Sequence, residues 1–234
     1  MREGPQDARQ VEIRLDGDSI MADLTVPKDC QGIVAFAHGS GSSRHSPRNR
    51  YVATSLVAGG FATVLADLLT PAEAAEDEQS AQIRFDIDLL TRRIIDVLDW
   101  TGGQEDLRTL PLGLFGASTG AAAALAAAAA RPGDVAAVVS RGGRPDLAGE
   151  SLPLVRAPTL LIVGGHDPKV LQLNRSALDR LECEASLEIV RGATHLFEEP
   201  GTLERVTRLA KDWFRNHLRM DRTLSRRSTG GRDG

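Results

Sequence analysis

The chain has few cysteines, no long apolar run and no excess of basic charge, and each of these absences removes a class of protein. Its two cysteines, Cys30 and Cys183, lie far apart and lack the spacing of a metal site, so we expect free thiols. No segment approaches the roughly 18 consecutive apolar residues that are needed to cross a bilayer. The formal net charge of −4 at pH 7 gives no overall basic footprint for nucleic acid. We therefore expect neither a membrane nor a nucleic acid as a partner.

The length and composition suit a single domain. The chain has 234 residues, of which 41% are hydrophobic, and this suffices for one sizeable core. The N-terminus carries charged residues where a signal peptide would need an apolar segment, so we expect a cytoplasmic location. The C-terminal end holds arginines among serines and glycines, with almost nothing apolar to bury. The expected division is an N-terminal extension over residues 1–10, a single domain over residues 11–220 and a disordered basic tail over residues 221–234.

Two kinds of strand pattern predict the fold class. Residues 11–15 and 20–26 alternate apolar with polar side chains around Asp16-Gly17-Asp18, which indicates an antiparallel hairpin. Later apolar runs are continuous, as is typical of strands buried on both faces of a parallel sheet, and segments of helical period lie between them. These runs cover residues 33–37, 62–65, 112–115, 136–139 and 159–163. The sequence therefore predicts an α/β fold with a mostly parallel, doubly wound sheet and an antiparallel N-terminal hairpin. The insertion over residues 68–84 is too short for a large cap domain.

A serine lies between one of these apolar runs and an alanine-rich helix. Gly116-Ala117-Ser118-Thr119-Gly120 follows residues 112–115 and precedes Ala121–Ala130. In a sharp strand-to-helix bend, glycines flank the serine because a Cβ there would collide with the neighbouring strand or helix. The alternative is a serine in an ordinary turn. The pattern favours Ser118 as a nucleophile held at the edge of the sheet.

A base and an acid follow at suitable places in the chain. Asp167 comes after the apolar run 159–163, and His195 comes after the strand-like residues 186–190. The order Ser118, Asp167, His195 is the order of an α/β-hydrolase catalytic triad. Asp167 could instead cap a helix that begins at Pro168, and both roles could hold together. For His195 the alternative is a histidine on a surface loop.

The oxyanion hole of such a site consists of two backbone N–H groups. One comes from the residue after the nucleophile, here Thr119, and one from an earlier strand-to-helix loop. The apolar strand 33–37 runs into the glycine- and serine-rich turn His38-Gly39-Ser40-Gly41, so Ser40 is the expected second donor. A short motif around one serine is weak by itself, but the four parts in the correct order are a strong signal.

Three segments carry a family resemblance. They are residues 36–49 (FAHGSGSSRHSPRN), 140–146 (SRGGRPD) and 195–201 (HLFEEPG). Over residues 32–218 the chain resembles the dienelactone hydrolase-like branch of the α/β-hydrolase superfamily, and more narrowly a bacterial subgroup found alone or fused to a phosphoribosyltransferase domain. The nucleophile of dienelactone hydrolases proper is a cysteine, whereas position 118 is a serine. This difference argues against dienelactone itself as the substrate.

Arg44, Arg141 and Arg144 lie on loops that leave the carboxyl ends of predicted strands, on the side of Ser118. A guanidinium group there can hold a carboxylate or phosphate with two hydrogen bonds. One of the three is therefore a candidate for binding an anionic part of the substrate, and the alternative is that they pair with loop acids such as Asp146. His45, on the first of these loops, is a minor candidate for lining the pocket.

The predicted activity is cleavage of a carboxylic ester, or a related acyl bond, of a small to medium substrate through an acyl-enzyme. No cofactor is required, and no cluster has the composition of a metal site. One alternative is an acyltransferase or perhydrolase that uses the same triad. The other is a non-catalytic ligand-binding module on the hydrolase fold. The sequence leaves open the choice among ester, thioester, lactone and amide, as well as the oligomeric state.

Overall fold

The computed structural model describes residues 7–219, and within them eight strands form one sheet in the order β1-β2-β4-β3-β5-β6-β7-β8. The pairs β1–β2 and β2–β4 are antiparallel, and all other neighbouring strands are parallel. The predicted fold class, with its N-terminal hairpin, is confirmed. The strands are β1 (Asp7–Arg14), β2 (Ser19–Val26), β3 (Gly32–Ala37), β4 (Phe61–Ala66), β5 (Leu112–Ala117), β6 (Val135–Arg141), β7 (Thr159–Gly164) and β8 (Ala185–Val190).

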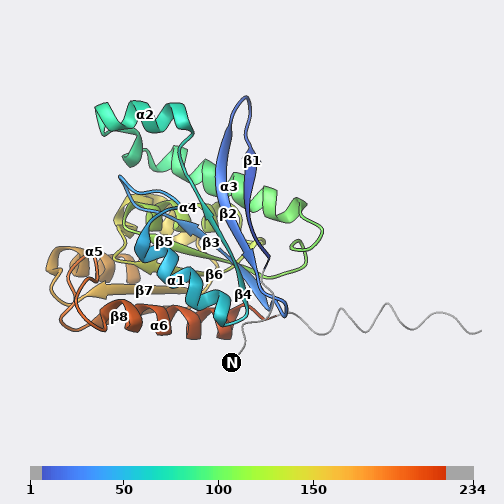
Figure 1. Ribbon diagram of the computed structural model, residues 1–234. Coiled ribbons are helices and arrows are strands. Elements are labelled where there is room, and N and C mark those ends of the chain that lie inside the picture. The colour runs from blue at the N-terminus through green and yellow to red at the C-terminus, as the bar shows by residue number, and fades with distance from the viewer. Residues whose placement is uncertain (1–6, 220–234) are drawn as a thin grey trace, which may run out of the picture.

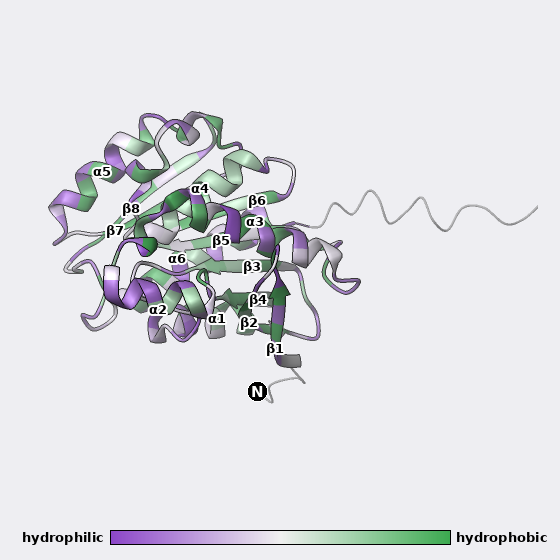
Figure 2. Ribbon diagram, turned by 90° about the horizontal axis from the view of Figure 1, so that it is seen from above, coloured by the Kyte–Doolittle hydropathy of each residue, from purple (hydrophilic) through white to green (hydrophobic). Residues whose placement is uncertain are grey.

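Helices cover both faces of the sheet (Figure 1). One core cluster joins the sheet to α1 and α6, and a second joins it to α3, α4 and α5. In Figure 2 the central strands are coloured as hydrophobic, whereas α2 is largely hydrophilic. The helices are α1 (Pro47–Ala58), α2 (Pro71–Ser80), α3 (Ile87–Gly103), α4 (Thr119–Ala130), α5 (Pro168–Leu178) and α6 (Thr202–His217), with 3-10 segments η1 (Ile83–Phe85) and η2 (Pro145–Leu154).

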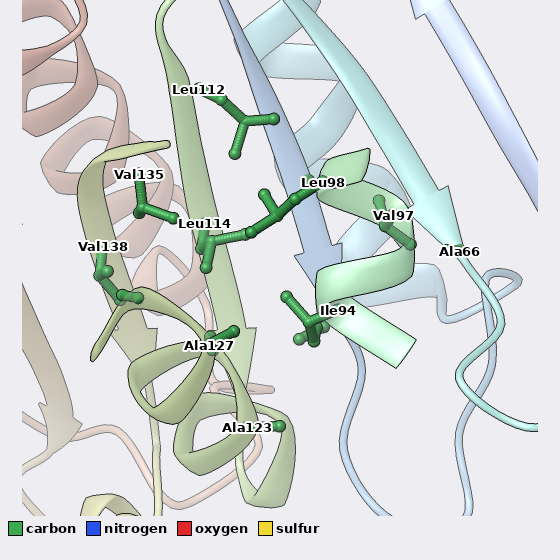
Figure 3. Packing of buried hydrophobic residues seen from close by; sticks show 14 of the residues in the cluster. Ala66, Ile94, Val97, Leu98, Leu112, Leu114, Ala123, Ala127, Val135 and Val138 are labelled. Atoms are coloured by element: carbon green, nitrogen blue, oxygen red, sulfur yellow. The ribbon is translucent and has the colours of Figure 1, made fainter. Parts of the chain in front are cut away.

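The alanine-rich helix α4 lies deep in the molecule. Figure 3 shows Ala123 and Ala127 of α4 near Ile94 of α3 and Leu114 of β5. All four side chains are almost completely buried. Short side chains let α4 approach the sheet and α3 closely, because a larger residue would have to displace the neighbouring backbone. This close packing fixes the start of α4, which is the site of the serine bend.

The structure differs from the sequence prediction at two elements. The first strand begins at Asp7, four residues before the predicted Val11, because its backbone pairs with β2 as far as Val26. Helix α2 was not predicted. It begins with a capping box between Thr70 and Glu73. Among its residues only Asp77 is buried, so the sequence lacks the apolar stripe by which an amphipathic helix is predicted.

Other predictions concern the ends of the chain and membranes. The predicted tail over residues 221–234 lies outside the described residues, so the division of the chain stays a prediction. Among residues 7–219 no helix is long and apolar enough to cross a membrane.

Candidate active site

Ser118 occupies a strained bend between β5 and α4. Its backbone angles are φ 52° and ψ −122°, in a region that residues with a side chain rarely adopt. A Cβ on Gly116 would lie 2.4 Å from Ala121 Cα, and a Cβ on Gly120 would lie 2.4 Å from the carbonyl oxygens of Ala37 and His38. Both flanking positions therefore require glycine, for the steric reason expected from the sequence.

Asp167 and His195 are in direct contact, although they lie on different loops. His195 Nδ1 is 2.7 Å from Asp167 Oδ2. The other carboxylate oxygen of Asp167 accepts a hydrogen bond of 3.3 Å from the N–H of Val170 at the start of α5. The two roles considered for Asp167, helix cap and histidine partner, are thus both compatible with its position. A carboxylate only accepts, so Nδ1 carries the proton in this contact and Nε2 is left as the basic nitrogen.

The loop that carries His195 is held by close packing. A Cβ on Gly164 would lie 2.5 Å from the carbonyl oxygens of Ala193 and Thr194, so the end of β7 touches this loop directly. Phe197 is fully buried with φ 57°, an unfavourable angle for an aromatic residue. Sequence reasoning missed Phe197, because burial and a positive φ leave no local signal in a phenylalanine. Its ring and strained backbone fix the loop just beyond His195.

Ser118 and His195 line the same cavity, which has a volume of about 230 Å³. Ser40, Asn49 and Arg141 also line it. Among the described residues, no hydrogen bond joins the Ser118 hydroxyl to His195. Catalytic hydrogen bonds of this kind are often long in the free enzyme and tighten when substrate binds. The structure therefore brings the three widely separated residues to one end of the sheet.

The two expected oxyanion donors lie beside each other. The N–H of Ser40 donates a 2.9 Å hydrogen bond to Thr119 Oγ1, so the loop after β3 is tied to the first residue of α4. A Cβ on Gly39 would lie 3.0 Å from Ser118 Cβ, which places this loop directly against the nucleophile candidate. The Ser40 N–H thus already has a partner, the threonine hydroxyl, and must exchange it to bind a substrate oxygen. The sequence did not suggest that contact.

His38 has a structural role at the start of the same loop. Its Nε2 accepts a 3.1 Å hydrogen bond from the Leu68 N–H, and its Nδ1 lies 3.0 Å from the Gly39 carbonyl oxygen. Burial lowers the pKa of His38, which keeps the ring neutral. A neutral ring with Nε2 as acceptor donates from Nδ1, so both ring nitrogens are satisfied by backbone groups.

The three candidate arginines differ sharply in their partners. Arg44 forms ion pairs with Asp67 and, at 3.5 Å, with Asp23. Arg144 holds Asp146 with two hydrogen bonds of 2.9 and 2.7 Å. Both therefore fit the alternative in which loop arginines pair with nearby acids. Arg141 is 8% exposed, and among the described residues its side chain contacts the neutral amide of Asn49 and no acid.

His45 lies in a second, larger cavity of about 490 Å³. This cavity also contacts α2 and the η1 residue Arg84, and it shares Ser40 with the smaller cavity. Arg84 pairs with the buried Asp77 at 2.6 Å. His45 is therefore near the serine-rich loop but outside the cavity of Ser118. Within residues 7–219 no group of three or more His, Cys, Asp or Glu side chains could hold a metal ion.

Comparison with known proteins agrees with this fold. Residues 20–219 match the model of the dienelactone hydrolase family. The dienelactone hydrolase from Anabaena variabilis has 51% sequence identity to this chain. Its crystal structure matches with a TM-score of 0.90, covering 92% of this chain and 99% of that one. Est1E from Butyrivibrio proteoclasticus has the same fold at 17% identity, with a TM-score of 0.75 over 89% of this chain and 98% of that one.

Two curated proteins of Mycobacterium tuberculosis strains, each named "Putative phosphoribosyl transferase", are 62% identical over 195 residues. The aligned region covers 83% of this chain but only 43% of each relative. The chain thus spans less than half the length of these relatives, in accord with the predicted resemblance to a subgroup with fused members.

Proposed function

Since this chain belongs to the dienelactone hydrolase family, we propose that it is a serine hydrolase that cleaves a carboxylic ester of a small to medium substrate. The family and the 51% identical dienelactone hydrolase support hydrolase activity. The finer assignment depends on one observation, the 2.7 Å contact of His195 with Asp167 beside a cavity that Ser118 also lines.

In the proposed first step, Ser118 Oγ attacks the carbonyl carbon of the ester. His195 Nε2 takes the hydroxyl proton, and Asp167 stabilises the resulting imidazolium through Nδ1–H. The same proton then passes to the leaving alcohol, which departs and leaves an acyl group on Ser118. The strained bend supports this role because it holds the hydroxyl out from both β5 and α4.

The tetrahedral intermediate carries a negative oxygen that needs hydrogen-bond donors. The N–H of Thr119, at the positive end of the α4 dipole, is one proposed donor. The N–H of Ser40 is the second, after it exchanges the Thr119 hydroxyl for the oxyanion. One such donor lowers the barrier by about 3 kcal/mol. Water then attacks the acyl-enzyme, with His195 as the base again, and no cofactor takes part in either step.

An activity-based probe tests this proposal. We expect a fluorophosphonate to label the folded protein at Ser118, which mass spectrometry of the peptides would locate, and Ser118→Ala to remain unlabelled. His195→Gln keeps the hydroxyl but removes the base, so labelling should slow by at least about 100-fold. If folded protein with an intact Ser118 is not modified, a ligand-binding module on the hydrolase fold becomes the better interpretation.

The product decides between hydrolysis and acyl transfer. With methyl butyrate as substrate, the proposed enzyme releases butyrate at the same yield when a competing alcohol or amine is added. An acyltransferase would instead form the corresponding ester or amide in proportion to the added nucleophile.

A further inference from the structure

Arg141 lies at the end of β6, directly beside the nucleophile candidate. Its carbonyl oxygen accepts a 3.2 Å hydrogen bond from the Ser118 N–H, and its Cα is paired with Ala117 in the sheet. The residue lines the same 230 Å³ cavity as Ser118 and His195. Arg141 is therefore next to Ser118 in the sheet and shares its cavity.

The positive charge of Arg141 is buried without compensation. Among residues 7–219, Nε and Nη1 have no hydrogen-bond partner, and Nη2 makes one long contact of 3.4 Å with Asn49 Oδ1. Of the two acids on the adjacent histidine loop, Glu198 pairs with Arg48 at 3.1 Å, and Glu199 accepts a 3.1 Å hydrogen bond from the Thr194 N–H. Burial, and to a smaller extent the charge of Arg48, lower the pKa of Arg141 to about 10, so the group is still a cation at neutral pH.

An unpaired buried cation destabilises a protein, because its hydration is lost and nothing replaces it. Arg44 and Arg144 lie on loops, as predicted, and both have carboxylate partners, whereas Arg141 is the last residue of β6 and not a loop residue. The difference indicates that the partner of Arg141 comes from outside the chain. The small cavity that opens beside it is the place where the substrate would lie.

We propose that Arg141 binds a carboxylate of the substrate, and that the enzyme acts on half-esters of short dicarboxylic acids. This inference rests on the proposed hydrolase function. Arg48 also lines the cavity but is paired with Glu198, so the remaining groups are the Arg141 guanidinium and the neutral amide of Asn49. These two groups suit a singly charged carboxylate better than a phosphate dianion, which would need further donors. The short path from Arg141 to Ser118 places the carboxylate a few bonds from the scissile carbonyl, so that monoesters of succinate or glutarate fit.

Matched substrates test the charge requirement. Monomethyl and dimethyl glutarate share one skeleton, and only the first carries a free carboxylate. We expect the wild-type protein to hydrolyse the half-ester with a higher kcat/KM than the diester, measured by methanol release. Arg141→Gln should lower kcat/KM for the half-ester about 100-fold and for the diester less than threefold, as expected when one partner of a buried charge pair is removed.

Two further variants separate charge from structure. Arg144→Gln removes a guanidinium that already has an acid partner, so the ratio of half-ester to diester should stay as in the wild type. Arg141→Lys keeps the charge and should retain part of the preference. Equal losses for both esters in Arg141→Gln, or a wild-type protein that prefers the diester, would overturn the proposal.

Binding to an inactive variant separates this inference from the proposed function. In Ser118→Ala, calorimetry should show binding of monomethyl glutarate that is lost when Arg141→Gln is added. This result would support the carboxylate site even if the wild-type protein hydrolysed nothing. If the wild-type protein hydrolysed neutral esters but no Arg141-dependent binding were seen, the carboxylate site would be refuted and the proposed hydrolase function would stand. Tighter Arg141-dependent binding of inorganic phosphate than of the half-ester would also refute it.

Discussion

The strain at Ser118 predicts that its removal stabilises the protein while abolishing activity. A non-glycine residue at φ 52° and ψ −122° lowers the free energy of unfolding by about 1–3 kcal/mol. Glycine adopts these angles without that strain. Glycine also has more conformational freedom in the unfolded chain, and this lowers the stability of the folded protein by about 0.5–1 kcal/mol. Ser118→Gly should therefore be more stable than Ser118→Ala by about 1 kcal/mol, or about 2–4 °C in melting temperature for a domain of this size. Neither variant should hydrolyse esters.

The comparison with Ser118→Ala is chosen because both variants lack the nucleophile and differ only in Cβ. Calorimetric melting of the two variants measures the difference. A matched control is Ser176, an exposed residue within α5, where glycine should be less stable than alanine by about 1 kcal/mol because helical backbone disfavours glycine. If Ser118→Gly is no more stable than Ser118→Ala, the bend is not strained and the steric reasoning about the nucleophile is wrong.

Three other outcomes follow from the geometry. Asp167→Asn keeps the helix cap but loses the charge beside the histidine, so kcat should fall about 10⁴-fold with little change in melting temperature. Gly120→Ala places a Cβ 2.4 Å from two carbonyl oxygens and should destabilise by about 3 kcal/mol in urea unfolding, whereas Gly133→Ala meets nothing within 4 Å and should be neutral. Because the pKa of Arg141 is lowered to about 10, the carboxylate-binding form prevails below that pH, and binding of monomethyl glutarate to Ser118→Ala should weaken as pH rises through 10. Unchanged affinity up to pH 11 would contradict this.

The sheet could be predicted from the sequence because buried parallel strands and covering helices impose strong local patterns. Strand β7, for example, was expected over residues 159–163 and extends over Thr159–Gly164. Helix α2 could not be found in this way, since it is stabilised by its capping box and by the Asp77–Arg84 pair rather than by an apolar stripe. Local periodicity reports burial, and an element without a buried face leaves little signal.

The site was predictable where chain order carries the information. Asp167 and His195 follow the strands that bring them together, so their contact was expected from topology. The arginines could not be sorted in advance, because their partners depend on long-range contacts. Arg44 meets an aspartate 23 residues away, whereas Arg141 meets none among the described residues. Ion pairing between loops is fixed by three-dimensional packing and leaves no pattern along the chain.

The hydrogen bond from Ser40 N–H to the Thr119 hydroxyl has a consequence for the selectivity of the proposed enzyme. A neutral ester carbonyl is an acceptor of similar strength to that hydroxyl, so a substrate in its ground state gains little by replacing it. An oxygen that becomes negative accepts a charge-assisted bond and can replace the hydroxyl favourably. The Thr119 hydroxyl is therefore displaced from the Ser40 N–H only when negative charge develops on the substrate oxygen. This raises kcat without tightening the binding of unreacted ester.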